Sequence, residues 1–228
     1  MVRIGDSLRG KRVLITQCED FMGPVLCDVF RAHGAEVIAN GQMLADPRAA
    51  EQIVAAAGTV DVLIANLAVP RPRTDVHQVT DEEWRHVFSH MVDPLPRLCR
   101  SVLPAMMERR SGKIVVMGSA SALRGMKQAS TYSAARGAQI AYVRAAGAEL
   151  AEYNVHINLI AQNFVDNPTY FPPEVQASDA FKQRLQQELP LQRLATPQED
   201  ALFAVFLASS EVNFFVGQSF PFAGGWVT

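Results

Sequence analysis

The sequence alternates short apolar runs of strand length with longer amphipathic stretches of helical length, and this alternation limits the fold more than any other feature. The apolar runs are rich in β-branched residues and lie at residues 12–16, 35–39, 60–66, 113–119 and 155–161. We expect each run to be a buried strand, because a strand covered on both faces reads as a continuous apolar segment. Strands that alternate with helices predict a parallel sheet with helices on both faces, and right-handed crossovers make this a doubly wound α/β fold.

Some helix boundaries are also marked in the sequence. Thr80 with Glu83, and Thr196 with Glu199, each have the spacing of a capping box, and a proline follows the second threonine at the first helical position. Three prolines fall between residues 81 and 110. We expect them to bend or break this segment, because a proline inside a helix removes a backbone hydrogen bond.

Composition favours one water-soluble domain. With 228 residues, of which 49% are hydrophobic and 19% charged, the chain can bury one core, and we expect a single domain over residues 1–228. A net charge of −2 with scattered basic residues gives no reason to expect a nucleic-acid partner. We find no run of membrane-spanning length and no signal-peptide core in residues 1–16, so we expect a cytoplasmic protein without a membrane partner. The cysteines have no metal-ligand spacing, so we predict buried free thiols and no metal site.

Ligands of a doubly wound sheet bind at the carboxyl ends of the strands, and the first loop at this edge is unlike a nucleotide-binding loop. A dinucleotide needs several glycines there, so that backbone N–H groups can touch its pyrophosphate. The loop after residues 12–16 keeps only Gly23, carries the acidic pair Glu19 and Asp20, and places the ring of Phe21 where the cofactor would lie. In the alternative interpretation, Phe21 turns into the core and a nucleotide still binds. We favour the first interpretation and expect no nicotinamide cofactor.

A second group of residues has the types and spacing of an acid–base site. Tyr132 and Arg136 are four positions apart, which on a helix places their Cβ atoms about 5–6 Å apart. Tyrosine is mostly protonated at neutral pH, and a guanidinium beside it would stabilise the phenolate. Ser119 ends the fourth predicted strand and can hydrogen bond to a substrate oxygen, whereas Ser121 is interpreted as a turn or cap residue. We predict Tyr132 as the base, Arg136 as its stabilising cation and Ser119 as the positioning residue; the alternative is an unremarkable pair on a solvated helix face.

Two patterns are similar to those of a known family: the Ser-x12-Tyr-x3-Arg pattern just described, and Thr-x4-Phe-x-Gly at residues 16–23. Together they resemble the halohydrin dehalogenases, also called haloalcohol dehalogenases, within the short-chain dehydrogenase/reductase superfamily. The resemblance covers nearly the whole chain, is strongest to the B-type branch, and implies a Rossmann-like sheet. Reductases of this superfamily carry lysine where this chain has Arg136, and a catalytic asparagine where it has Met91. The resemblance therefore implies a site without hydride transfer.

The implied activity is that of a cofactor-independent lyase, which converts vicinal haloalcohols into epoxides with release of halide. In reverse, it would open epoxides with small anions such as azide, cyanide and nitrite. The halide would bind at residues 162–172, with the backbone amides of Phe164 and Val165 as donors. The other residues expected to line the halide and substrate pocket are Phe21, Gln162, Asn163 and Phe171. The alternative for this segment is an ordinary loop with core aromatic residues.

Members of the resembled family commonly form tetramers, so a homotetramer is implied, and the small residues of 134–153 would suit close helix packing. The sequence ends soon after Trp226, so we expect no tail that reaches a neighbouring subunit. Two other functions remain open. An NAD(P)-dependent reductase with an unusual loop would bind NADH or NADPH and oxidise it with a carbonyl substrate. A non-catalytic binding protein with a reductase fold would turn over no substrate.

Overall fold

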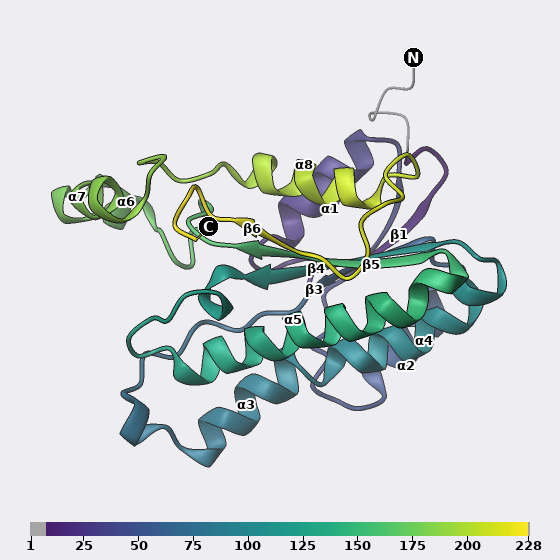
Figure 1. Ribbon diagram of the computed structural model, residues 1–228, viewed down its shortest axis with the longest axis horizontal. Helices are drawn as coiled ribbons and strands as arrows, with labels where there is room; N and C mark the ends of the chain where they lie inside the picture. The colour runs from purple at the N-terminus through teal and green to yellow at the C-terminus, as the bar shows by residue number, and fades with distance from the viewer. Residues whose placement is uncertain (1–7, 228) are drawn as a thin grey trace.

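The computed structural model describes residues 8–227, which form a six-stranded sheet covered by helices on both faces (Figure 1). All neighbouring strands are parallel. The strand order is β2-β1-β3-β4-β5-β6, with β1 (Arg12–Thr16), β2 (Glu36–Asn40), β3 (Val62–Asn66), β4 (Gly112–Ser119), β5 (Val155–Gln162) and β6 (Ser219–Phe222). The chain moves outward in opposite directions from β1 and β3, which makes this pair the point where ligands bind in such sheets. The predicted doubly wound α/β fold is confirmed.

The two edges of the sheet differ from the sequence prediction. The five predicted strands correspond to β1–β5, but β2 begins one residue later than expected and is partly exposed, so its description as buried was wrong. An edge strand has a neighbour on one side only, which leaves more of it in contact with solvent. The opposite edge strand, β6, was not predicted; it contains a proline, which an edge strand tolerates. The domain bounds 1–228 stay a prediction, because residues 1–7 and 228 lie outside the described residues.

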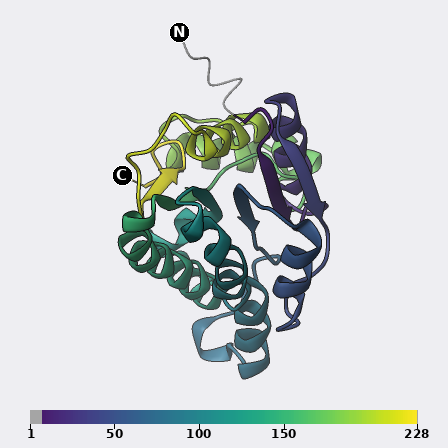
Figure 2. The ribbon, with the colours of Figure 1, turned by 90° about the vertical axis from the view of Figure 1, so that its right-hand side faces the viewer.

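Helices pack on both faces of the sheet, and each face has its own apolar cluster (Figure 1). In Figure 2 the yellow-green α8 lies above the strands and the teal-green α5 lies below them. One face carries α1 (Gly23–Ala32) and α8 (Pro197–Ala208), and the other carries α2 (Ala49–Ala57), α4 (Pro94–Glu108) and α5 (Ser130–Leu150). The remaining helices are α3 (Asp81–Met91), α6 (Pro173–Ala177) and α7 (Asp179–Glu188), with short 3-10 turns η2 (Val76–Gln78), η3 (Ala120–Ala122) and η4 (Ala151–Tyr153).

The two predicted capping boxes have different outcomes. The capping box at the start of α8 is confirmed in both directions. At the start of α3, Thr80 Oγ1 accepts from the Glu83 amide at 3.1 Å, but the Glu83 carboxylate does not return to Thr80. It accepts instead from Thr74 Oγ1 at 2.6 Å and from Thr131 Oγ1 at 2.7 Å. The helix start at Thr80 is therefore confirmed, but the return hydrogen bond from Glu83 was wrongly expected, and Glu83 ties α3 to the start of α5.

The prolines between residues 81 and 110 have unequal effects. The helical segment is interrupted after Met91, and Pro94 begins α4. Pro104, in contrast, lies inside α4 without ending it, so of the expected bend or break the break does not occur there. Pro104 is exposed, and on the exposed side of a helix the carbonyl that loses its partner can be hydrated.

Small residues and cysteines also depart from simple expectations. Gly147 of α5 packs against Gly217 of the same chain so closely that a Cβ atom would overlap its backbone, so this glycine serves a contact within the chain. The homotetramer stays a prediction. All three cysteines are free thiols; Cys27 and Cys99 are buried, but Cys18 is partly exposed, contrary to the prediction. Among residues 8–227, no helix is long and apolar enough to span a membrane, and no cluster of metal-binding side chains is found.

Candidate active site

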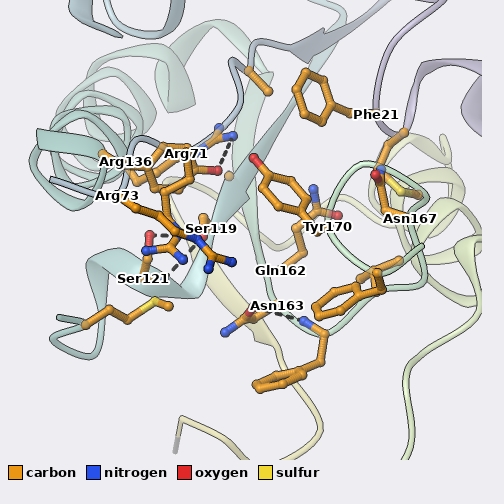
Figure 3. A pocket seen from close by; sticks show the side chains of 18 of the residues that line it. Phe21, Arg71, Arg73, Ser119, Ser121, Arg136, Gln162, Asn163, Asn167 and Tyr170 are labelled. Atoms are coloured by element: carbon orange, nitrogen blue, oxygen red, sulfur yellow. Dashed lines mark hydrogen bonds between the residues drawn. The ribbon is translucent and has the colours of Figure 1, made fainter. Parts of the chain in front are cut away.

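A cavity of about 360 Å³ lies at the carboxyl ends of the strands (Figure 3). Its walls come from the loop after β1, the ends of β3, β4 and β5, the first turns of α5, and the segment between β5 and α7. The cavity brings together all the residues predicted for the site: Phe21, Ser119, Tyr132, Arg136, Gln162, Asn163, Phe164, Val165 and Phe171. The roles assigned to these residues remain predictions that their geometry can support or weaken.

Tyr132 and Arg136 lie one turn apart on the inner side of α5, as their spacing predicts. Arg136 Nη2 donates a hydrogen bond to Tyr132 Oη at 3.0 Å, and the guanidinium carbon lies 5.1 Å from the tyrosine ring centroid. Only 7% of Tyr132 and 2% of Arg136 are exposed, so the alternative of a pair on a solvated helix face is wrong. A charged donor at this distance stabilises negative charge on a phenol oxygen.

The other end of the Arg136 guanidinium is fixed by the protein. Its Nη1 donates to Leu67 O at 3.0 Å, Met117 O at 2.9 Å and Gln139 Oε1 at 3.0 Å. Gln139 is fully buried and donates from Nε2 to Met91 O at 2.7 Å. Arg136 Nε is buried and has no acceptor among the described residues. The sequence analysis missed Gln139; the signal was a polar residue three positions after Arg136 on the buried side of the same helix.

Ser119 is the last residue of β4 and pairs in register with Gln162, the last residue of β5. Ser119 Oγ donates to Ser121 Oγ at 3.0 Å and accepts from the Ser121 amide at 3.2 Å. Ser121 also lines the cavity, so its interpretation as only a turn or cap residue was incomplete. The two hydroxyl groups give this end of the cavity a connected pair of donors and acceptors.

Phe21 lines the cavity from the loop after β1, so the alternative in which it turns into the core is wrong (Figure 3). The loop reaches this position through a left-handed backbone conformation at Phe21, with φ of 51°. Gly23 is required for the turn, because a Cβ atom there would overlap the carbonyl oxygen of Gln17. The single glycine that the loop keeps therefore serves the turn that presents Phe21.

Tyr170 is a second tyrosine in the cavity, and the sequence analysis gave it no role. Its ring centroid lies 6.0 Å from that of Phe21, and its hydroxyl donates to Val69 O at 3.3 Å. Burial, and then the proximity of Tyr132, raise the pKa of Tyr170 above its usual value. Tyr170 therefore stays protonated near neutral pH, whereas the direct hydrogen bond from Arg136 goes to Tyr132.

The predicted halide loop is irregular, as expected, but one of its predicted donors is engaged. The Phe164 amide donates to Asn163 Oδ1 at 3.0 Å, so its expected role as a free donor is not supported by this geometry. The Val165 amide has no hydrogen-bond acceptor among residues 8–227. Gln162 Oε1 is also buried without a partner in the described chain. Val165 and Gln162 are thus the polar groups of this loop that remain open to a ligand.

A family model described as enoyl-(acyl carrier protein) reductase matches residues 23–227, so the chain belongs to this family of the short-chain dehydrogenase/reductase superfamily. The 3-oxoacyl-(acyl-carrier-protein) reductase FabG of Salmonella typhimurium is 27% identical over 244 residues, covering 96% of this chain and 98% of the relative.

Two solved structures of similar shape carry dehalogenase titles. One, described as a dehalogenation enzyme, has a TM-score of 0.89 and 30% identity, covering 96% of this chain and 99% of the other. The second is a halohydrin dehalogenase bound to ethyl (2S)-oxiran-2-ylacetate, with a TM-score of 0.86, 25% identity, and coverage of 96% and 98%. Relatives of this chain therefore carry both reductase and dehalogenase names, so the reaction must be argued from the residues of the site.

Proposed function

We propose that this protein is a cofactor-independent halohydrin dehalogenase of the B-type, a lyase that converts vicinal haloalcohols into epoxides with release of halide. The observation that carries the proposal is the buried Tyr132–Arg136 pair, which faces a cavity that Phe21 lines on the side of the former nucleotide loop. Similarity to two structures with dehalogenase titles supports the same conclusion.

The proposed reaction begins with proton transfer. Ser119 holds the substrate hydroxyl, and Tyr132, as a phenolate stabilised by Arg136, takes the proton from it. The resulting oxygen attacks the neighbouring carbon from the side opposite the halogen, the carbon–halogen bond breaks, and the halide leaves with the electron pair. The proton remains on Tyr132 until solvent removes it. In reverse, a small anion such as azide, cyanide or nitrite attacks an epoxide carbon, and Tyr132 returns the proton to the oxygen.

The departing halide needs a place that stabilises a monovalent anion and keeps water away. The Val165 amide is a donor without an acceptor among the described residues. The unpaired atom of Gln162 is Oε1, which accepts hydrogen bonds, so the Val165 amide is the group that would donate to the halide. Two aromatic rings, Phe164 and Phe171, stack nearby with centroids 6.1 Å apart. Donors beside apolar rings stabilise an anion more strongly than donors in water.

The residues present do not fit a nicotinamide cofactor. The loop after β1 carries Glu19 and Asp20, which would repel a pyrophosphate, and Phe21 lines the space beside them. These features support a reaction that uses no nucleotide.

A direct assay tests the proposal. The purified protein is incubated with 1,3-dichloro-2-propanol at mildly alkaline pH without nucleotide, and chloride and epichlorohydrin are measured against heat-inactivated protein. We expect the two products in equal amounts. The reductase names of the sequence relatives favour one second candidate, an NADPH-dependent reductase. Binding of NADPH and its oxidation with a 3-oxoacyl thioester, without chloride release, would establish that alternative; no turnover in either assay would leave a binding protein.

A further inference from the structure

Two arginines outside the proposed catalytic group line the same cavity. Arg71 and Arg73 belong to an Arg-Pro-Arg segment that follows β3. Both line the cavity together with Ser119 and Tyr132, and Figure 3 shows them on the same side as Arg136, away from Phe21. Arg71 is half-buried and Arg73 is exposed. Their positions place cationic groups between the proposed reaction centre and solvent.

Neither arginine is neutralised by the protein. The ion pairs of the described residues involve other basic residues. Arg71 Nη1 reaches only the Gln128 carbonyl oxygen, at 3.5 Å, and Arg73 forms no hydrogen bond or ion pair with any residue in 8–227. A fourth cavity arginine, Arg184, is paired with Glu188 at 3.2 Å. The lining contains no aspartate or glutamate.

Two guanidinium groups without a negatively charged partner repel each other when they lie in a partly enclosed cavity. Burial, and then the positive charge of Arg73, lower the pKa of Arg71. Arginine nevertheless stays protonated in proteins, so both groups keep their charge. A bound anion would relieve this repulsion, and the planar fork of a guanidinium matches the two oxygens of a carboxylate.

We infer that the preferred substrates carry a carboxylate at the end remote from the halogen, and that Arg71 and Arg73 bind it. This inference rests on the proposed dehalogenase function and adds the substrate class. The hydroxyl group would lie at Ser119 and Tyr132, and the halogen would face Val165, so the carboxylate is left to the side that the two arginines occupy. A small chlorohydroxy acid such as 4-chloro-3-hydroxybutanoate has these three groups on one short chain.

The test compares this acid with its methyl ester, which keeps the reacting atoms and loses the negative charge. Initial rates of chloride release give kcat/KM for both, and the ratio of acid to ester is the readout. We expect a ratio of roughly 10 to 100 in the native protein, which corresponds to about 1.4–2.7 kcal/mol of additional binding for the charged group. In the Arg71→Gln/Arg73→Gln double variant the ratio should fall toward one, chiefly through KM. Arg48→Gln removes the same charge from an exposed arginine that does not line the cavity and should leave the ratio unchanged.

The outcomes separate this inference from the function on which it rests. Chloride release from the ester, with a ratio near one in the native protein, would overturn the carboxylate preference and leave the dehalogenase function intact. A high ratio that the double variant keeps would overturn the assignment to Arg71 and Arg73. No chloride release from either compound would overturn the function and the inference together. Added salt should lower the rate with the acid more than the rate with the ester, because screening acts on the charged partner.

Discussion

Two walls of the cavity are built in different ways. The polar wall consists of Ser119, Tyr132 and Arg136, and the aromatic wall consists of Phe21, Phe164 and Phe171. The polar wall lies on regular elements, β4 and α5, with hydrogen bonds that fix each group. The aromatic wall lies on loops, and it needs left-handed backbone conformations at Phe21 and Phe164, with φ of 51° and 55°. The groups proposed to move protons are therefore held by helix and strand, whereas the groups proposed to enclose the ligand are held by turns.

The comparison predicts different kinetic effects for the two walls. A change in the polar wall removes an interaction with the reacting atoms, so it should lower kcat. A change in the aromatic wall removes contact with the ligand, so it should mainly raise KM. Three variants test this division, in decreasing order of expected effect, and a fourth, at Asp200, changes stability alone.

Tyr132→Phe should have the largest effect, because it removes the proposed base. We expect kcat for chloride release to fall by about 10²–10⁴-fold, the range typical of a lost acid–base group. Tyr170→Phe is the comparison variant, since Tyr170 also lines the cavity and lies beside Tyr132, but its hydroxyl donates to Val69 O and receives no hydrogen bond from Arg136. Its loss should be much smaller. If Tyr170→Phe proves the more damaging change, the base has been assigned to the wrong tyrosine.

Arg136→Lys should have the next largest effect. Arg136 donates to four acceptors, whereas a lysine ammonium has only three N–H groups. At least one buried acceptor is left unpaired, which should lower the free energy of unfolding by about 1–3 kcal/mol, measured in urea. We expect kcat to fall by roughly 10–100-fold, the equivalent of a similar free energy. Arg144→Lys, on the exposed side of the same helix, serves as the control; equal losses in both variants would show that the effect is not specific to the polar wall.

Phe21→Ala tests the aromatic wall. Phe21 is half-buried, so its loss should remove about 1 kcal/mol of apolar contact with the ligand and raise KM by roughly fivefold to tenfold. The change in kcat should be smaller than the change in KM. Phe214→Ala is the control, because Phe214 is 98% exposed and does not line the cavity. A large fall in kcat with KM unchanged would contradict the division between the two walls.

Asp200→Asn should affect neither wall and change only stability. Asp200 is buried in α8 without a hydrogen-bond partner among the described residues, and burial raises its pKa to about 8. The native state therefore keeps a proton that the unfolded state releases near pH 4, so wild-type stability falls as pH rises from about 4 to about 8. Asparagine stays neutral, so the variant should have the higher Tm at pH 9. Each 1 kcal/mol by which its free energy of unfolding exceeds that of the wild type should raise Tm by about 2–4 °C. At pH 5 the difference should be small.

The Asp200 variant also separates the stability of the fold from the chemistry of the polar wall. Its kcat/KM should follow the same pH profile as the wild type, because Asp200 does not line the cavity. A shifted activity profile would show that pH effects on the reaction arise from the fold and not from Tyr132. Thermal unfolding at several pH values and rates of chloride release at the same values supply both measurements.

The sequence predicted those parts of the molecule that follow from local spacing. Residues i and i+4 share a helix face, so the contact between Tyr132 and Arg136 could be expected, and β1 has the predicted bounds. Long-range partners could not be expected. Nothing near Glu83 indicates that its carboxylate accepts from Thr131 and not from its own cap, because that choice depends on how α3 packs on α5.

The residues of the aromatic wall were predicted mainly by family resemblance. The resemblance did not predict which of their backbone amides are already hydrogen bonded within the protein. The Phe164 amide donates to Asn163 Oδ1, and this hydrogen bond depends on the side-chain torsion of Asn163, which the sequence pattern does not determine. Arg71 and Arg73 were missed because two exposed-looking arginines after a strand are usually solvated surface residues; only the course of the loop brings them to the cavity. The available signal was a pair of arginines in the loop that follows a central strand, β3 (Val62–Asn66).

Two hydrogen bonds hold helix α3 in a fixed position along α5, the helix that carries Tyr132 and Arg136. Helix α3 is tied to α5 at two points, where Thr131 donates to Glu83 at 2.7 Å and Gln139 donates to Met91 O at 2.7 Å. The ties are eight residues apart on each helix, from 83 to 91 and from 131 to 139, a span of about 12 Å. Because the spacing is equal, α3 cannot slide along α5 without breaking both ties at once. Tyr132 and Arg136 lie between these points, so the contact of α3 with α5 keeps the phenol and the guanidinium in register with each other.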